Sequence, residues 1–181
     1  MKVKVGESIL ELVQGDITQQ DTEAIVNAAN PSLLGGGGVD GAIHRAAGPE
    51  LLEECKTLGG CAPGDAKITK GYRLKAKYVI HAVGPIYKRE GTRAPEVLAS
   101  AYRRSLELAS EHGIRTVAFP SLSTGAYGYP VKEAAPVALK AVADYLKGHP
   151  EIGLVRFVLY DSKTYQAYEE ALRGLGFPEF C

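Results

Sequence analysis

Two glycine-rich stretches are the parts of this sequence best suited to bind an anion. The first, residues 28–40, contains four consecutive glycines and then a valine: Gly35, Gly36, Gly37, Gly38 and Val39. The second, residues 120–130, contains a run of small residues followed by a tyrosine: Ser123, Thr124, Gly125, Ala126 and Tyr127. Glycine lets backbone N–H groups approach an anion, and a helix N-terminus adds unpaired donors. Two such loops side by side could hold a diphosphate, although each alone also suits a mobile surface turn.

Neither loop matches the dinucleotide-binding fingerprint or the P-loop in full. Gly36-x-Gly38-x-x-Gly41 has the glycine spacing of the dinucleotide fingerprint, but that fingerprint begins directly after the first strand, and here residues 27–34 intervene. A P-loop requires Gly-Lys followed by Ser or Thr, which both loops lack. A nicotinamide-dependent dehydrogenase and a P-loop nucleotidase are therefore disfavoured.

Three polar side chains accompany the first loop. Asn27 and Asn30 flank the end of the preceding strand, and an asparagine amide can hold sugar hydroxyls or orient a water. Asp40 opens a helix directly after the glycines, where a carboxylate could act as a base or position a water. The alternatives stay open: both asparagines suit a turn, and Asp40 suits a helix N-cap.

A second group of candidates could recognise a nucleoside. Asp16 follows a predicted strand, and its carboxylate could accept a hydrogen bond from the exocyclic amine of adenine, or simply belong to a turn. Tyr127, Tyr129 and Tyr160 could stack on a base or on a ribose, or pack in the core.

Histidines and cysteines give no sign of a metal centre. His44 in a helix of small residues and His81 in an apolar strand are interpreted as structural, because no Cys or carboxylate stands at ligand spacing. The three cysteines, Cys55, Cys61 and Cys181, are odd in number and form no Cys-x-x-Cys pair. We therefore expect idle thiols in a reducing cytoplasm, with no metal and no other cofactor.

Composition limits the class of partner. The chain has 181 residues, of which 45% are apolar and 23% charged, as in a single globular domain. Its 21 basic residues balance its 21 acidic residues, whereas nucleic-acid binders usually carry a basic excess. No apolar run reaches 18 residues and the first residues lack the apolar run of a signal peptide. We expect a small ligand rather than nucleic acid or a membrane.

Strands and helices alternate along the sequence. Apolar, β-branched runs predict strands at 8–13, 24–27, 66–70, 78–83, 116–119 and 154–160. Amphipathic runs predict helices at 40–47, 49–58, 95–112, 131–147 and 162–175, and the polar segment 88–94 is predicted to be a surface loop. The alternation predicts an α/β domain with a largely parallel sheet covered on both faces. In such sheets ligands bind beyond the carboxyl ends of the strands, where both glycine-rich loops lie.

Four segments in sequence resemble the macro domain family. They are Gly15-Asp16-Ile17-Thr18, residues 24–30 (AIVNAAN), residues 35–48 (GGGGVDGAIHRAAG) and residues 123–130 (STGAYGYP), with residues 78–85 (YVIHAVGP) as a further family-like strand. The resemblance extends over nearly the whole chain and is closest to the MacroD-type ADP-ribosyl hydrolases and O-acetyl-ADP-ribose deacetylases. It implies a single domain, residues 1–181, folded as a three-layer α/β/α sandwich around a mixed, largely parallel sheet.

The resemblance also implies roles for the candidate residues. Asp16 and the backbone of Ile17 would select adenine, and Tyr160 would stack on its ring. Residues 35–39 and 123–127 would hold the diphosphate, with Asn27 among the binding residues. Asn30 and Asp40 would face the distal ribose and carry the catalysis.

The implied reaction is hydrolysis of an ester on the distal ribose, formed with an acetyl group or with a protein glutamate or aspartate. Asp40 would position or activate water, a substrate phosphate could share that role, and Asn30 would hold the ribose. Because no Ser-His-Asp or Cys-His arrangement is apparent, we expect direct attack by water. The implied ligands are ADP-ribose and O-acetyl-ADP-ribose, and the implied partners are mono-ADP-ribosylated proteins. The main alternative is a reader that binds ADP-ribose without hydrolysing it and has no need of Asp40.

Overall fold

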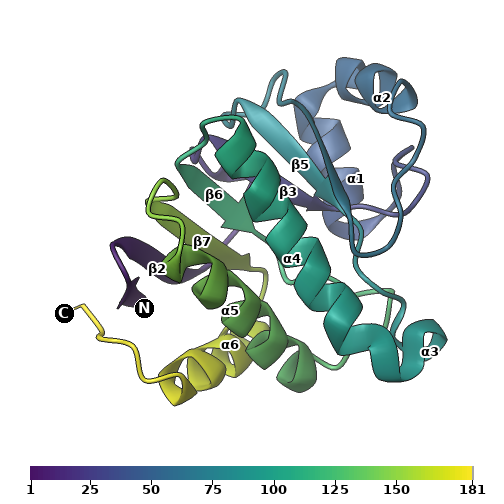
Figure 1. The fold of residues 1–181 in the computed structure, drawn as a ribbon. Helices are drawn as coiled ribbons and strands as arrows, with labels where there is room; N and C mark the ends of the chain where they lie inside the picture. The colour runs from purple at the N-terminus through teal and green to yellow at the C-terminus, as the bar shows by residue number, and fades with distance from the viewer. Residues whose placement is uncertain (181) are drawn as a thin grey trace.

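A seven-stranded sheet forms the centre of the computed structural model, which describes residues 1–180 (Figure 1). The strands are β1 (Lys2–Val5), β2 (Ser8–Gln14), β3 (Ala24–Ala28), β4 (Ala66–Lys70), β5 (Tyr78–Ala82), β6 (Thr116–Phe119) and β7 (Leu154–Leu159). Their spatial order is β1-β2-β7-β6-β3-β5-β4. The five inner strands run parallel, while β1 and β4 are antiparallel to their neighbours at the two edges. The sheet is largely parallel, as the alternation of strands and helices predicts, and mixed, as the family resemblance implies.

Helices cover both faces of the sheet. They are α1 (Gly38–Ala47), α2 (Pro49–Lys56), α3 (Tyr87–Glu90), α4 (Ala94–Glu111), α5 (Val131–Lys147) and α6 (Ser162–Gly174), with 3-10 turns η1 (Ile17–Gln19) and η2 (Gly91–Arg93). Figure 1 shows α4, α5 and α6 in front of the sheet and α1 and α2 behind it. The fold is a three-layer α/β/α sandwich. Within residues 1–180, no helix combines the length and apolar character needed to cross a membrane.

Alternation along the inner strands builds two cores. In β7, Phe157 faces α4 and α6 and packs on Phe119, Tyr102 and Tyr168, whereas the next residue, Val158, belongs to the core beneath α1 and α2. Both side chains are buried. Strands buried on both faces read as continuous apolar runs, which is why the inner strands could be predicted.

Three predictions about local structure were incomplete or wrong. The edge strand β1 was not predicted, because four residues of alternating Lys and Val are too few to distinguish from a polar terminus. Residues 88–94 are not a loop: most of them belong to α3 and η2, an exposed helical approach to α4. Helix α1 begins at Gly38, so Asp40 lies inside its first turn rather than at its cap.

The connections leaving β3 and β6 explain where a cleft forms. These strands are parallel neighbours, but β3 leads to α1 on one face and β6 leads to α5 on the other. The chain therefore diverges beyond their carboxyl ends, which is the usual place for a ligand in an open α/β sheet.

Candidate functional site

A cleft of about 380 Å³ opens at the carboxyl ends of β3 and β6. Both glycine-rich loops contribute to it, so the sequence segments at residues 28–40 and 120–130 lie side by side. Its lining residues are Ala28, Ala29, Asn30, Gly36, Gly37, Gly38, Val39, Asp40, Gly84, Ser121, Leu122, Ser123, Gly125, Ala126 and Tyr127. Backbone and small side chains dominate this lining, as a site that holds an anion by N–H groups requires.

The first loop ends at the N-terminus of α1. Gly35 and Gly38 have φ angles of 92° and 56°, a region in which other residues are strained. Gly37 is the N-cap and provides no side-chain hydrogen bond to the first turn. Gly37 therefore leaves the first N–H groups of α1 without a capping side chain, which suits them to bind an anion in the cleft.

The second loop is fastened from behind by two buried tyrosines. Tyr168 donates from its hydroxyl to Ser121 Oγ at 2.8 Å, and the hydroxyl of Tyr102 accepts from the backbone N–H of Leu122 at 2.9 Å. Thr124 faces inward to Ser121, with its Oγ1 2.9 Å from Ser121 Oγ, and does not line the cleft. These bonds hold the loop in one position while its outer side stays free for a ligand.

Ser123 is the most constrained residue of this loop. Its φ of 67° is unusual for a residue other than glycine, and among residues 1–180 its buried Oγ has no hydrogen-bond partner. Gly84 lies directly against it, because a Cβ at position 84 would overlap Ser123 Oγ. A buried hydroxyl without a partner at the wall of a cleft is suited to donate to a bound oxyanion.

Asp40 is a buried carboxylate at the base of the cleft. It is only 5% exposed, and its Oδ1 accepts a hydrogen bond from Asn27 Nδ2 at 2.8 Å. His44, one turn later on α1, places Nε2 3.4 Å from the same oxygen. The N-cap alternative for Asp40 is therefore wrong: Gly37 is the N-cap, and the hydrogen bond to the carboxylate comes from the Asn27 side chain.

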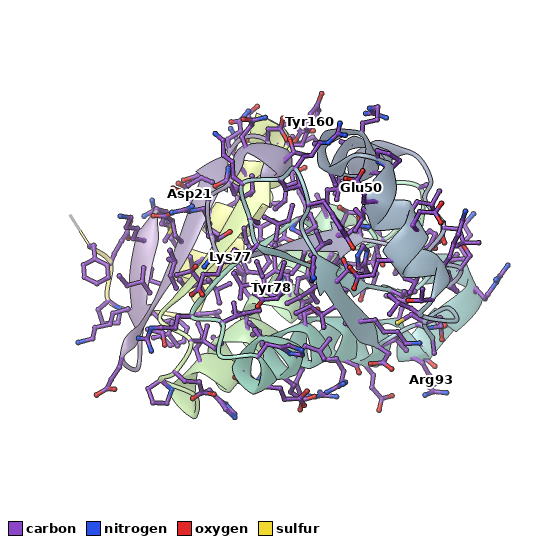
Figure 2. All side chains as sticks on the ribbon, turned by 90° about the horizontal axis from the view of Figure 1, so that it is seen from above. Asp21, Glu50, Lys77, Tyr78, Arg93 and Tyr160 are labelled. Carbon is purple, nitrogen blue, oxygen red and sulfur yellow. The ribbon has the colours of Figure 1, made fainter. Side chains whose placement is uncertain are left out.

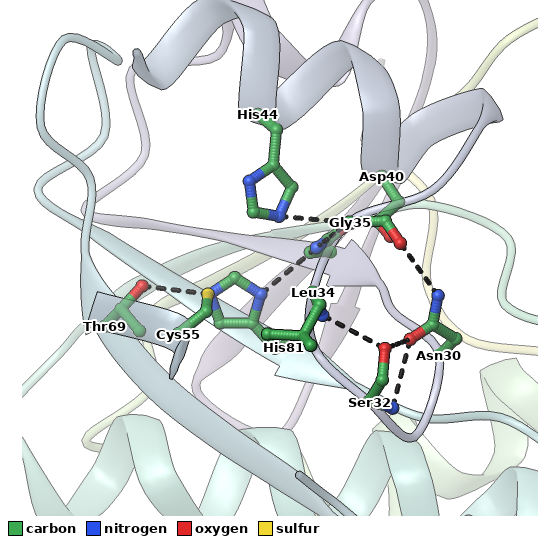
Figure 3. Close-up of polar contacts among 10 residues, drawn as sticks. Asn30, Ser32, Leu34, Gly35, Asp40, His44, Cys55, Thr69 and His81 are labelled. Carbon is green, nitrogen blue, oxygen red and sulfur yellow. Dashed lines mark hydrogen bonds and ion pairs between the residues drawn. The ribbon is translucent and has the colours of Figure 1, made fainter. Parts of the chain in front are cut away.

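Asn30 has two structural tasks in addition to lining the cleft. Its Nδ2 donates to the carbonyl oxygen of Gly35 at 2.9 Å, and its Oδ1 accepts from Ser32 N and Oγ (Figure 3). A Cβ at Gly36 would lie 3.4 Å from Asn30 Nδ2 and 3.2 Å from Asp40 Oδ2. The side chains of Asn30 and Asp40, the two predicted catalytic residues, therefore both lie next to Gly36.

Tyr127 lines the same cleft as Asp40. Burial, and in second place the negative charge of Asp40, raise the pKa of the Tyr127 phenol. Its hydroxyl therefore remains protonated and able to donate to a ligand.

Six predicted residues do not line this cleft: Asp16, Ile17, Asn27, Gly35, Thr124 and Tyr160. Asn27 is fully buried beneath Asp40, and Gly35 borders a separate shallow hollow with His44 and Arg45. Ile17 is buried in the core beneath α1.

Asp16 and Tyr160 lie together at the ends of the next two strands. Gly15 N donates to Leu159 O at 3.0 Å, which joins the residues just before them. Asp16 Oδ1 accepts from Thr18 N and Oγ1, and within residues 1–180 its Oδ2 has no hydrogen-bond partner. Tyr160 is 87% exposed and lies at the edge of the molecule (Figure 2), which leaves its ring open for stacking.

Neither a reactive thiol nor a metal cluster is present among residues 1–180. Cys55 and Cys61 are buried, and burial raises the pKa of each thiol to about 11, so both stay protonated. Cys181 lies outside the described residues. No group of three or more His, Cys, Asp or Glu side chains in this part of the chain could hold a metal ion.

Sequence reasoning missed part of the cleft and its support. Gly84 lines the cleft although it lies in neither predicted loop, and Ser121 and Leu122, which belong to the second loop, line it although they were not named as site residues. Gly84 comes two residues after β5 and Ser121 comes two residues after β6, so their position beyond a strand end was the available signal. His81 beneath the cleft was interpreted only as structural.

Comparison with known proteins decides the family. Residues 26–138 match the model of the macro domain, which is more than half of the chain. The chain belongs to the macro domain family. An O-acetyl-ADP-ribose deacetylase from Cronobacter turicensis is 54% identical to this macro domain over 167 residues, covering 90% of this chain and 95% of the relative.

Two further relatives extend the likeness. The ADP-ribose glycohydrolase MACROD2 of Xenopus laevis is 53% identical over 176 residues, which cover 94% of this macro domain but 42% of that protein. The solved structure of the Oceanobacillus iheyensis macrodomain with ADP is 45% identical, with a TM-score of 0.93, and the match covers 97% of this chain and 95% of that chain.

Proposed function

We propose that this macro domain binds ADP-ribose and hydrolyses esters on its distal ribose. The observation that carries the proposal is one cleft in which two backbone-lined anion loops meet a buried carboxylate, Asp40. A module that only bound the ligand would have no use for a desolvated carboxylate at that place. The names of the Cronobacter and Xenopus relatives, a deacetylase and a glycohydrolase acting on ADP-ribose compounds, support an enzyme.

The order of the strands supports this ligand. Along the carboxyl edge of the sheet, Asp16 and Tyr160 follow β2 and β7, the second loop follows β6, and the first loop follows β3. With neighbouring strands about 4.8 Å apart, these four ends span roughly 14 Å. Adenine at β2 and β7, diphosphate at β6 and β3, and distal ribose at α1 would follow one another without a gap.

The proposed reaction uses one water and gives ADP-ribose and a carboxylic acid. Asp40 takes a proton from the water as its oxygen attacks the ester carbonyl, and backbone N–H groups of the loops stabilise the oxyanion. The carbon–oxygen bond to the ribose then breaks, and the proton passes to the departing hydroxyl. Asn30 fixes the ribose with the Nδ2 hydrogen that Gly35 does not use.

The serine hydroxyls in the cleft are poorly placed to form an acyl-enzyme, which favours direct attack by water. Ser121 Oγ is tied to Tyr168 and Thr124, and Ser123 Oγ has no base within hydrogen-bond distance among residues 1–180. A serine nucleophile needs an adjacent base. We therefore assign no covalent intermediate.

The remaining features of the proposal are a single domain over residues 1–181, a cytoplasmic location and mono-ADP-ribosylated proteins as a second substrate class. Two protonated, buried thiols are compatible with a reducing compartment. We assign no partnership with nucleic acid or with membranes, and no cofactor.

The test is to incubate the protein with O-acetyl-ADP-ribose and with a glutamate-linked ADP-ribosylated protein and to measure released ADP-ribose. Turnover of either ester supports the hydrolase, and the ratio of the two rates identifies the preferred acyl group. Binding of ADP-ribose without turnover of either ester would leave a reader module.

Calorimetry should show that ADP-ribose binds at least about tenfold more tightly than AMP. AMP lacks the second phosphate and the distal ribose, and one hydrogen bond to a charged group contributes about 1.5–3 kcal/mol. Equal affinities would contradict the assignment of the two loops to a diphosphate.

Asp16→Asn should weaken ADP-ribose binding by about 1.5–3 kcal/mol and relax the preference for adenine over bases without its amine. Asparagine keeps Oδ1 as the acceptor from Thr18, but its free atom becomes an NH₂ group that cannot accept from adenine. Asp21→Asn, a change at a nearby exposed carboxylate, is the matched control for charge. Unchanged affinity and base preference in Asp16→Asn would reduce Asp16 to a turn residue.

A further inference from the structure

A buried row of hydrogen bonds extends from Asp40 away from the cleft into the sheet. Asn27 Nδ2 lies 2.8 Å from Asp40 Oδ1 and 3.1 Å from His81 Nδ1, and His81 Nε2 lies 2.9 Å from Thr69 Oγ1. Figure 3 shows His81 between Thr69 and the group around Asp40. Asn27 and His81 are paired in register on the parallel strands β3 and β5, so both side chains face α1. All four residues are buried.

The hydrogen bonds of this row have one consistent direction. Thr69 donates from Oγ1 to the carbonyl oxygen of Lys70 at 3.1 Å, which leaves its oxygen to accept from His81 Nε2–H. His81 Nδ1 then carries a lone pair and accepts from Asn27 Nδ2. The second hydrogen of Nδ2 goes to Asp40.

The orientation of the Asn27 amide depends entirely on its nitrogen side. Among residues 1–180, its Oδ1 is buried without a hydrogen-bond partner, so nothing on the oxygen side holds the amide. With the proton on His81 Nδ1, two donors would oppose each other at 3.1 Å, and the amide would have to turn. Turning it would bring Oδ1 against the Asp40 carboxylate, where like partial charges repel.

We infer that His81 is a positioning residue for Asp40: its Nε2–H tautomer, fixed by Thr69, holds the Asn27 amide so that Nδ2 faces the carboxylate. The inference rests on the proposed function, because it concerns the group that acts on water. His81 does not itself exchange protons with Asp40, since an amide lies between them. Burial, and secondarily the charge of His44, lower the pKa of His81 to about 3, so the ring stays neutral at working pH.

Thr69 gives a cleaner test than His81, whose replacement would leave buried groups on both sides unpaired and could unfold the protein. Thr69→Val keeps the shape of the side chain and removes the hydroxyl, whereas Thr69→Ser keeps the hydroxyl. In Thr69→Val, the polar neighbour of His81 Nε2 that remains within residues 1–180 is the protonated thiol of Cys55, with Sγ at 3.8 Å. A thiol that donates to Nε2 favours the opposite tautomer, with the proton on Nδ1.

We expect Thr69→Val to lower kcat for O-acetyl-ADP-ribose by about tenfold or more, because small misplacements of a reacting group are costly. The dissociation constant of ADP-ribose should stay within about twofold of the wild type, since no ligand contact is lost. Thr69→Ser should retain the wild-type kcat. A purely structural role would lower binding, thermal stability and turnover together.

Nitrogen-15 NMR of labelled histidine reports the tautomer independently of activity. The wild type and Thr69→Ser should show His81 neutral and protonated at Nε2 from pH 8 to pH 5, and Thr69→Val should shift toward protonation at Nδ1. Protonation at Nδ1 in the wild type, or equal kcat in Thr69→Val and Thr69→Ser, would overturn the inference. If the wild type hydrolysed neither ester, both the proposed function and the role of His81 would be contradicted. If the wild type were active and Thr69→Val and Thr69→Ser had equal kcat values, only the role of His81 would be contradicted.

Discussion

Asp40→Asn is expected to slow hydrolysis of O-acetyl-ADP-ribose by roughly 10²–10⁴-fold, the usual contribution of a general base. Asparagine has nearly the same shape, and its Oδ1 can still accept from Asn27 Nδ2, so the fold around the cleft should not change. The amide cannot take a proton from water. Steady-state rates should therefore collapse, while the melting temperature and the calorimetric affinity for ADP-ribose stay near their wild-type values.

The control for this prediction is Asp144→Asn, which removes an exposed carboxylate on α5 and should leave turnover unchanged. Its ion pair with Lys140 is at the surface and contributes little to stability. Full activity of Asp40→Asn would exclude Asp40 as the base and would shift that role to a phosphate of the substrate. A large loss of ADP-ribose affinity instead would make Asp40 a binding residue.

The placement of the two glycine-rich loops could be predicted from sequence because it depends on local patterns. Apolar runs fix the inner strands, amphipathic runs fix the helices, and the order of a parallel sheet brings consecutive loops to one edge. The sequence did not reveal which strands are neighbours in the sheet. The structure pairs β3 with β6, and this pairing places residues 28–40 next to residues 120–130. The antiparallel direction of the edge strands β1 and β4 depends on which strand each one pairs with, and a short sequence pattern does not reveal that partner.

The environment of Asp40 could not be predicted in the same way. Its partner Asn27 lies 13 positions earlier, and His81 lies 54 positions beyond Asn27. These contacts exist because β3 and β5 pair in a register that sets Asn27 opposite His81. A single polar residue in each of two otherwise apolar strand ends was the available signal, and it suggests a buried partner without naming it.

Gly41→Ala is expected to weaken ADP-ribose binding by about 10–100-fold, which corresponds to the 1–3 kcal/mol that overpacking usually costs. A Cβ at position 41 would lie 2.7 Å from the carbonyl oxygen of Gly36, a contact with backbone that a side-chain rotation cannot relieve. Either α1 or the glycine loop must move. Helix α1 is anchored by Ile43 and Ala47, both fully buried, whereas Gly37 and Gly38 have open space around them.

The loop should therefore be displaced, and the loss should appear in affinity and turnover rather than in the melting temperature. Gly174→Ala is the matched control: it makes the same substitution at the end of α6, where a Cβ meets nothing within 4 Å and the backbone is already helical. There alanine should be neutral or stabilise the protein by about 0.4–1 kcal/mol. A fall in melting temperature of Gly41→Ala with unchanged affinity would show that the helix yields instead of the loop, and that the position of Gly36 does not control binding.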